Sequence, residues 1–303
     1  MHWGNKLAIS VASGKGGVGK SSFVGNLGVA FAQQERRVIL VDADIGAANL
    51  HTMVGIPYPE RTLADFLNSS QYTLEQVLCP TAFGSMQLLS SAADILAIAS
   101  PTYQKTQKLY RSITRLESDL VIFDIAAGTN QRAIDFFSLA PVGIIIVEAV
   151  PTSLENAFLF IKNLRFRTLL RLFYHDKQMR ATIEQFADPR YGNKILNFES
   201  LLTELDKLAP QKVAMFRGLF TKENYRLCLV ANSIKNEQQA MAIEKFAKVV
   251  KRYLDLSPLI LGVLPYEPEM DIAISQRTPF IVKYPQSGYA KAMHSIVASI
   301  PAF

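Results

Sequence analysis

The stretch that decides the fold reads Val11-Ala12-Ser13-Gly14-Lys15-Gly16-Gly17-Val18-Gly19-Lys20-Ser21-Ser22. From Gly14 to Ser21 it fits the spacing G-x-x-x-x-G-K-[ST], which is typical of phosphate-binding loops. The apolar run 7–11 before it predicts a strand, and the run 23–31 after it predicts a helix. A glycine-rich turn without a ligand is the alternative, and the order of strand, loop and helix argues against it.

The residue types in this loop suit phosphate chemistry. Glycines let backbone N–H groups turn toward phosphate oxygens, and the following helix adds the partial positive charge of its N-terminus. Lys20 is expected to reach the β- and γ-phosphates, and the hydroxyl of Ser21 is expected to bind Mg²⁺. We therefore predict a nucleotide-binding loop made of Gly14, Lys15, Gly16, Gly17, Val18, Gly19, Lys20, Ser21 and Ser22.

Composition and length bound the remaining possibilities. The chain has 303 residues, of which 49% are apolar and 19% charged, and its formal net charge is +6. A basic balance permits contact with nucleic acid or an anionic membrane surface without proving either. Cys79 and Cys228 are the only cysteines and form no C-x-x-C pair, which argues against a disulfide framework or an iron–sulfur site.

The sequence also predicts where the protein resides. The first residues, Met1 to Lys6, do not resemble a signal peptide, and no apolar run approaches the roughly 18–20 residues that a membrane span needs. We therefore expect a cytoplasmic protein, either free or peripheral to the membrane or the nucleoid.

Acidic residues follow two of the expected strands. The apolar run 38–41 leads into Asp42 and Asp44, and the run 120–123 leads into Asp124. The second pattern is that of a Walker B strand, whose acid joins the Mg²⁺ shell, and the carboxyl ends of parallel strands are where open α/β sheets bind ligands. A helix cap is the alternative for Asp42 and Asp44. We predict Ser21 and Asp124 as the Mg²⁺ site.

Strands alternate with helices along most of the chain, which predicts an α/β fold with a mainly parallel, doubly wound sheet. The stretch from Pro151 to Glu155 predicts the start of a helix, with Thr152 or Ser153 as its N-cap. We predict one domain over 1–303 with an inserted helical lobe at about 165–225. Arg165, Arg167 and Arg171 in that lobe permit contact with a membrane, DNA or a protein, or else belong to a solvated helix face.

Lys15 makes the loop a deviant Walker A motif, and with Asp42-Ala43-Asp44-Ile45-Gly46 and Asp124 the chain resembles the MinD/ParA family of P-loop ATPases. The resemblance covers most of the chain outside the lobe. Within the family it is closest to the FlhG-like branch, which sets flagellar number and placement. The stretches that carry this are Val41 to Leu50, Pro151 to Ala157, and Arg277-Thr278-Pro279-Phe280 with Tyr284-Pro285-Gln286-Ser287.

The resemblance implies a slow, partner-stimulated ATPase that binds ATP or ADP with Mg²⁺ and forms a homodimer when ATP is bound. Lys15 would reach the phosphates of the nucleotide bound by the partner subunit, whereas Lys20 would contact the phosphates of the nucleotide bound by its own subunit. Asp44 would orient the attacking water. By the same resemblance Asn232 would meet the adenine edge, with Pro265 and Tyr266 beside the base.

Three functions follow as hypotheses. The first is an ATP-driven dimerisation switch that regulates cellular or flagellar positioning through an unidentified protein partner. The second is a ParA-like partitioning ATPase that binds non-specific DNA. The third is a module that holds nucleotide without hydrolysing it. The spacing of Cys79 and Cys228 argues against the iron–sulfur branches that share the deviant loop.

Overall fold

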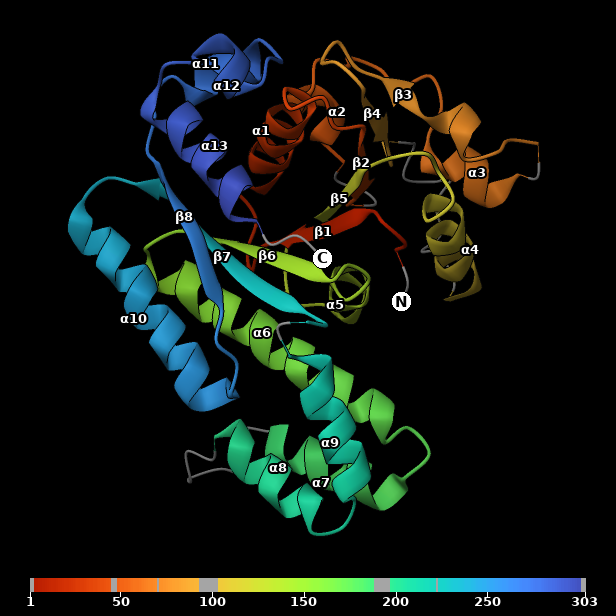
Figure 1. Ribbon diagram of the computed structural model, residues 1–303, viewed down its shortest axis with the longest axis vertical. Coiled ribbons are helices and arrows are strands. Elements are labelled where there is room, and N and C mark those ends of the chain that lie inside the picture. The colour runs from red at the N-terminus through yellow and green to blue at the C-terminus, as the bar shows by residue number, and fades with distance from the viewer. Residues whose placement is uncertain are drawn as a thin grey trace.

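The computed structural model describes residues 3–44, 48–69, 71–92, 103–187, 197–221 and 223–300. These residues form one sheet with helices on both faces (Figure 1). Its strands are β1 Leu7–Ala12, β2 Val38–Ala43, β3 Cys79–Pro80, β4 Met86–Leu89, β5 Leu120–Ile125, β6 Val142–Val147, β7 Arg226–Ile234 and β8 Leu259–Pro265.

The sheet has eight strands in the order β3-β4-β2-β5-β1-β6-β7-β8. All neighbouring pairs are parallel except β3 and β4, which are antiparallel. Parallel neighbours need crossover connections, and the helices between the strands provide them. The predicted α/β fold with a mainly parallel, doubly wound sheet is confirmed. The order also places β1, which leads into the phosphate loop, between β5 and β6.

The central strands are buried on both faces, which explains why they read as continuous apolar runs. Successive side chains point to opposite faces. In β1, Ala8 and Ala12 belong to one hydrophobic cluster, whereas Ile9 and Val11 belong to the other. Each cluster is closed by its own layer of helices.

The first cluster contains side chains of α4, α5, α6 and α10, and the second contains side chains of α1, α2, α11, α12 and α13. None of the helices within the described ranges has the length and hydropathy needed to cross a lipid bilayer. The helices are α1 Lys20–Ala32, α2 Leu50–Met53, α3 Leu63–Asn68, α4 Tyr103–Ile113, α5 Gln131–Phe137, α6 Pro151–Leu172, α7 Lys177–Ala187, α8 Phe198–Asp206, α9 Pro210–Leu219, α10 Glu237–Leu254, α11 Met270–Ser275, α12 Phe280–Lys283 and α13 Gly288–Ser299, with a 3₁₀ turn at Glu75–Val77.

The single tryptophan of the chain anchors its N-terminal end. Trp3 packs edge-on against Tyr110 and Phe123, with ring centroids 5.3 and 5.8 Å away, and its Nε1 donates a hydrogen bond to the carbonyl of Leu139 at 2.9 Å. An indole that is buried with its N–H satisfied contributes a large apolar area at little polar cost. This contact joins the N-terminus to β5 and to the end of α5.

Helix α6 is longer than the sheet is deep. It has 22 residues, or about 33 Å at 1.5 Å per residue, whereas a six-residue strand spans about 20 Å. It begins after the carboxyl end of β6 and therefore runs past the opposite edge of the sheet. Helices α7, α8 and α9 gather around its far end, below the sheet in Figure 1.

These lobe helices have a hydrophobic cluster of their own. Its members come from the second half of α6 and from α7, α8 and α9, and the chain returns from α9 into β7. The cluster consists of Leu169, Phe173, Met179, Ile183, Phe198, Leu201, Leu202, Leu205, Val213 and Phe216.

Arg165 lies between the lobe and the sheet-bearing part of the chain. Only 2% of it is exposed. Its guanidinium carbon lies 4.5, 4.6 and 4.5 Å from the ring centroids of Phe198, Phe216 and Phe220. Its Nη2 lies 3.7 Å from a carboxylate oxygen of Asp255, and burial lowers the pKa of Arg165 to about 10. The planar cation therefore acts as a packing element among aromatic rings.

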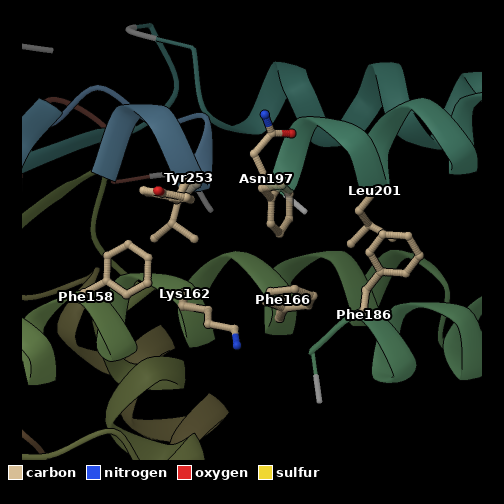
Figure 2. A pocket seen from close by; sticks show the side chains of 9 residues that line it. Phe158, Lys162, Phe166, Phe186, Asn197, Leu201 and Tyr253 are labelled. Carbon is tan, nitrogen blue, oxygen red and sulfur yellow. The ribbon is translucent and has the colours of Figure 1, made fainter. Parts of the chain in front are cut away.

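A cavity of about 180 Å³ adjoins the same junction, among the described residues. Figure 2 shows the rings of Phe158 and Phe166 from α6 facing it from one side and Tyr253 from α10 facing it from the other. Lys162 also lines it, and its ammonium donates to the carbonyl of Ala187 at 3.1 Å. The remaining lining residues are Phe186, Asn197, Phe198, Leu201 and Leu254.

Candidate nucleotide site

The predicted phosphate loop forms an open turn between β1 and α1. Gly17 and Gly19 both have a φ of 81°, a left-handed conformation that favours glycine. A Cβ added at Gly16 or Gly17 would meet no atom within 4 Å, so the outer side of the loop is open. Helix α1 begins at Lys20, immediately after the loop. Unpaired N–H groups of a helix N-terminus therefore face the space that the loop encloses.

Lys20 and Asp124 form a buried ion pair at the base of this loop. The ammonium of Lys20 donates to a carboxylate oxygen of Asp124, and their side chains are 8% and 1% exposed. Burial raises the pKa of Asp124, while the charge of Lys20 and hydrogen bonds from Lys20 and Ser21 act in the opposite direction. Lys20, Ser21 and Asp124, predicted from separate motifs, therefore meet at one point.

Two further carboxylates, those of Asp42 and Asp44, lie near this pair. Asp42 and Asp124 are register partners on adjacent strands β2 and β5, and the charge of Asp44 raises the pKa of Asp124. Burial, with the charge of Asp124 as a second cause, raises the pKa of Asp42 from 3.8 to about 7. These acids lie at the carboxyl ends of parallel strands, which is the edge of the sheet where open α/β folds bind their ligands.

Asp42 also accepts backbone hydrogen bonds from the chain that follows β2, although the N-cap of α2 is Asn49 and not one of the two acids of the alternative interpretation. The amides of Asp44 and Leu50 donate to its carboxylate at 3.1 and 3.2 Å, and Leu50 is the first residue of α2. Asp42 thus fixes the chain that follows β2. Asp44, in contrast, is half-buried, and its backbone is held by the hydrogen bond that its amide donates to the Asp42 carboxylate.

Lys15 lies on the more open side of the loop, paired with Glu148. Its ammonium is 3.2 Å from the Glu148 carboxylate, and the two side chains are 32% and 25% exposed. Glu148 follows β6, and its amide donates to the hydroxyl of Ser153 at 3.0 Å. The predicted N-cap was wrong: α6 begins at Pro151 with Val150 as its N-cap and no side-chain cap, because proline suits the first helical position and Thr152 and Ser153 therefore lie inside the first turn.

The residues predicted for the adenine lie at the ends of β7 and β8. The amide nitrogen of Asn232 donates to the carbonyl of Val18 at 2.8 Å, so it touches the phosphate loop. Pro265 ends β8, and the half-exposed ring of Tyr266 lies beneath the ammonium of Lys235 at 4.4 Å. Ser22 is turned elsewhere, since its hydroxyl lies 3.4 Å from the sulfur of Met270.

Two contacts of the loop escaped the sequence-based reasoning. A Cβ at Gly14 would lie 2.3–2.6 Å from backbone atoms of Asn156 and Ala157, so α6 packs directly on the loop. The amide of Gly128, after the Walker B strand, donates to the carbonyl of Ser13 at 3.1 Å. Gly128 has a φ of 100°, a left-handed conformation that favours glycine. Neither contact has a local signal, because each joins distant parts of the chain.

The side chains present suit a magnesium nucleotide. The open glycine turn fits phosphate oxygens, Lys20 supplies a cation, and Ser21 with Asp124 supplies hard oxygen ligands. Within the described ranges, no group of three or more His, Cys, Asp or Glu side chains is arranged to hold a metal ion. A Mg²⁺ ion bound with nucleotide needs fewer protein ligands, because phosphate and water oxygens complete its shell.

Comparisons with known proteins agree with this geometry. The antiactivator FleN of Pseudomonas aeruginosa is 24% identical over 297 residues, covering 97% of this chain and 86% of that protein. The flagellum site-determining protein YlxH of Helicobacter pylori is 27% identical over 160 residues, covering 52% of this chain and 54% of that protein. The resemblance to the FlhG-like branch is therefore confirmed.

A solved structure gives the same fold. The septum site-determining protein MinD of Pyrococcus horikoshii, complexed with Mg-ADP, superposes with a TM-score of 0.64 at 21% identity, covering 96% of this chain and 94% of that one. The ParA family model, described as NUBPL iron-transfer P-loop NTPase, matches residues 5–163. The chain therefore belongs to the MinD/ParA family of P-loop NTPases, with FlhG-like proteins among its relatives.

Proposed function

We propose that this protein is an ATP-binding and ATP-hydrolysing switch that forms a homodimer when ATP is bound. The observation that carries the proposal is the contrast between the two lysines of the loop. Lys20 is buried against Asp124, whereas Lys15 is one-third exposed beside Glu148. A partly exposed cation next to a phosphate loop is well placed to offset charge on a nucleotide held by a second subunit.

The other residues take complementary roles in this proposal. Lys20 exchanges Asp124 for the β- and γ-phosphates, and Ser21 and Asp124 hold Mg²⁺, which neutralises phosphate charge when bound. Asp44 orients the attacking water. Asn232, Pro265 and Tyr266 contact the base. The hydrogen bond from Asn232 to Val18 in the loop and the pair of Lys20 with Asp124 support the roles of those residues, whereas the roles of Pro265 and Tyr266 come from the resemblance.

Light scattering with and without MgATP tests the dimer. We expect the wild type to dimerise in ATP, and Lys15→Ala to remain monomeric while still binding nucleotide. Lys245→Ala, an exposed lysine on α10, is the matched control and is expected to dimerise normally. If Lys15→Ala dimerises in MgATP to the same extent as the wild type, the proposal is wrong.

For the cellular role we propose an FlhG-like regulator of flagellar number or placement. The names of FleN, an antiactivator, and YlxH, a flagellum site-determining protein, support it. Affinity capture with the full-length Asp44→Asn variant in ATP is the test, because that variant is expected to persist as the ATP-bound dimer. Recovery of flagellar proteins is expected, and recovery of septum or plasmid-partition proteins instead would contradict the role.

A ParA-like DNA-binding function is the second candidate. The residues that support it are not the arginines that the sequence analysis singled out. Arg165 is buried, and Arg167 and Arg171 both bind Asp135, so all three arginines already make contacts within the chain. DNA binding is favoured instead by an exposed basic face on α10, which consists of Lys245, Lys248, Lys251 and Arg252. Within the described residues, none of these four side chains forms an ion pair. Absent or salt-insensitive binding to non-specific DNA would exclude this function.

The third hypothesis is that the protein binds nucleotide without hydrolysing it. A hydrolysis assay distinguishes this hypothesis from the proposed ATPase. In the proposed mechanism Asp44→Asn abolishes phosphate release and leaves ATP affinity nearly unchanged, since the residue acts on water and not on the bound phosphates. If the wild type and Asp44→Asn both release no phosphate, the protein is a binding module.

A further inference from the structure

Helix α6 touches the phosphate loop directly. The backbone of its second turn, at Asn156 and Ala157, lies so close to Gly14 that a Cβ there would approach to 2.3 Å. Backbone contacts of this kind leave no flexible side chain to absorb a displacement. A shift of α6 and a shift of the loop are therefore linked.

The same helix reaches the segment that follows Asp124. The amide nitrogen of Asn163 donates to the carbonyl of Thr129 at 3.5 Å. On its other side this segment is held by the phosphate loop, through the hydrogen bond from Gly128 to Ser13. In GTPases, switch segments are ordered by contacts with the γ-phosphate and are released on hydrolysis, so the position of such a segment is coupled to the state of the nucleotide.

Side chains of α6 also hold α5, the helix that follows this segment, through one carboxylate bound by two arginines. Arg167 binds Asp135 through both Nε and Nη2, the latter at 2.6 Å, and Arg171 binds the same carboxylate. Asp135 belongs to α5, which starts directly after the segment with Asn130 as its N-cap. A planar two-point contact fixes direction as well as distance.

Both arginines stand on the part of α6 that belongs to the lobe. Leu169 and Phe173, two and six residues after Arg167, are fully buried in the lobe cluster. Arg165 is enclosed by three aromatic rings of α8, α9 and the residue after α9. The lobe and this half of α6 therefore move as one body.

We propose that Asp135 is a positioning residue for ATP hydrolysis: held by Arg167 and Arg171, it sets α5 and hence the segment 125–130 after Asp124. This inference rests on the proposed ATPase function and adds its regulation. The three side chains are between 29% and 48% exposed. Exposed pairs are individually weak, so a partner that engages the lobe can reset the contact and change turnover without touching the nucleotide.

The test compares two carboxylates of the lobe region in the full-length protein. Asp135→Asn is expected to lower kcat for MgATP by about 5-fold or more, because misplacing groups near the reacting atoms slows turnover, with KM and nucleotide affinity within about 2-fold. The matched control is Glu199→Gln, since Glu199 forms a similar two-point contact with Arg217 and, within the part of the chain that the structure describes, no hydrogen bond or ion pair joins it to α5. Its kcat is expected to equal that of the wild type.

Two further variants separate positioning from general destabilisation. Asp135→Glu keeps the carboxylate and is expected to restore most of kcat. Adding Arg167→Gln to Asp135→Asn is expected to have no additional effect, because both remove the same contact. The inference would be overturned by additive losses of kcat in the double variant, by an unchanged kcat in Asp135→Asn, or by an equal change in Glu199→Gln. Each of these results would leave the proposed ATPase function standing. A wild type that hydrolyses no ATP would overturn the proposed function, and this inference with it.

Discussion

The two ends of α6 are built differently. At its start the helix meets the phosphate loop backbone to backbone, at Gly14, beside the half-exposed pair of Lys15 and Glu148. At its far end it is held by side-chain packing around the buried Arg165. The first end depends on residue types at fixed spacing, whereas the second depends on rings brought together from distant segments. Binding chemistry is therefore concentrated at one end, and packing energy at the other.

The largest effect is expected at the packed end. Arg165→Ala removes a long side chain from among three rings and should lower the free energy of unfolding by about 2–5 kcal/mol. Arg165→Met preserves most of the volume and should cost less than about 1.5 kcal/mol. Urea denaturation of both variants checks this. Equal losses would mean that the charge of Arg165, and not its packing, holds the lobe.

A smaller loss is expected from crowding at the other end. Gly14→Ala places a Cβ within 2.6 Å of backbone atoms of α6, so the nucleotide-free protein should lose about 1–3 kcal/mol by overpacking. Gly16→Ala is the control, because its Cβ meets nothing within 4 Å, and it should stay within about 0.5 kcal/mol of wild type. Thermal and urea unfolding without nucleotide measure both. Equal stability of the two variants would contradict a backbone contact between loop and helix.

The pH dependence of stability should also differ between the nucleotide site, which contains Asp42, and the packed end of α6. Burial raises the pKa of Asp42 from 3.8 to about 7, so the folded state binds a proton more tightly than the unfolded state. The resulting stabilisation is complete below about pH 4 and is lost as pH rises toward 7, by about 1 kcal/mol per pH unit near pH 6. Urea unfolding of the nucleotide-free protein at several pH values measures this slope.

In Asp42→Asn that slope should flatten, because asparagine does not titrate. A variant at the packed end, Arg165→Met, should keep the wild-type slope, since the pKa of Arg165 stays near 10 and outside this window. An unchanged slope in Asp42→Asn would assign the pH dependence to another group.

The smallest effect on stability is expected for the half-exposed pair. Glu148→Gln removes one partner of Lys15 and should change the free energy of unfolding by less than about 1 kcal/mol. Because it releases Lys15 for contact across a dimer, it should also strengthen ATP-dependent dimerisation several-fold in sedimentation measurements. Glu155→Gln, an exposed residue on the first turns of α6, is the control. Weaker dimerisation of Glu148→Gln would assign the carboxylate to the dimer contact itself.

This difference between the ends also explains what the sequence could predict. The sheet followed from apolar runs bounded by turns, and Lys20, Ser21 and Asp124 followed from motifs, since loop and strand geometry is set locally. Arg165 was expected to be solvated or to contact a partner, because Phe198, Phe216 and Phe220 lie too far along the chain to be assigned to it. Asp135 gave no signal, because its arginines belong to another helix.

The N-terminal anchor provides a built-in optical reporter. Trp3 is the single indole of the chain, and its ring packs on Phe123, the residue immediately before Asp124. Its emission is therefore sensitive to the environment of the strand that carries the Walker B acid, without any label. Stopped-flow fluorescence of the unmodified protein can follow the Walker B strand in real time as nucleotide and partner are added.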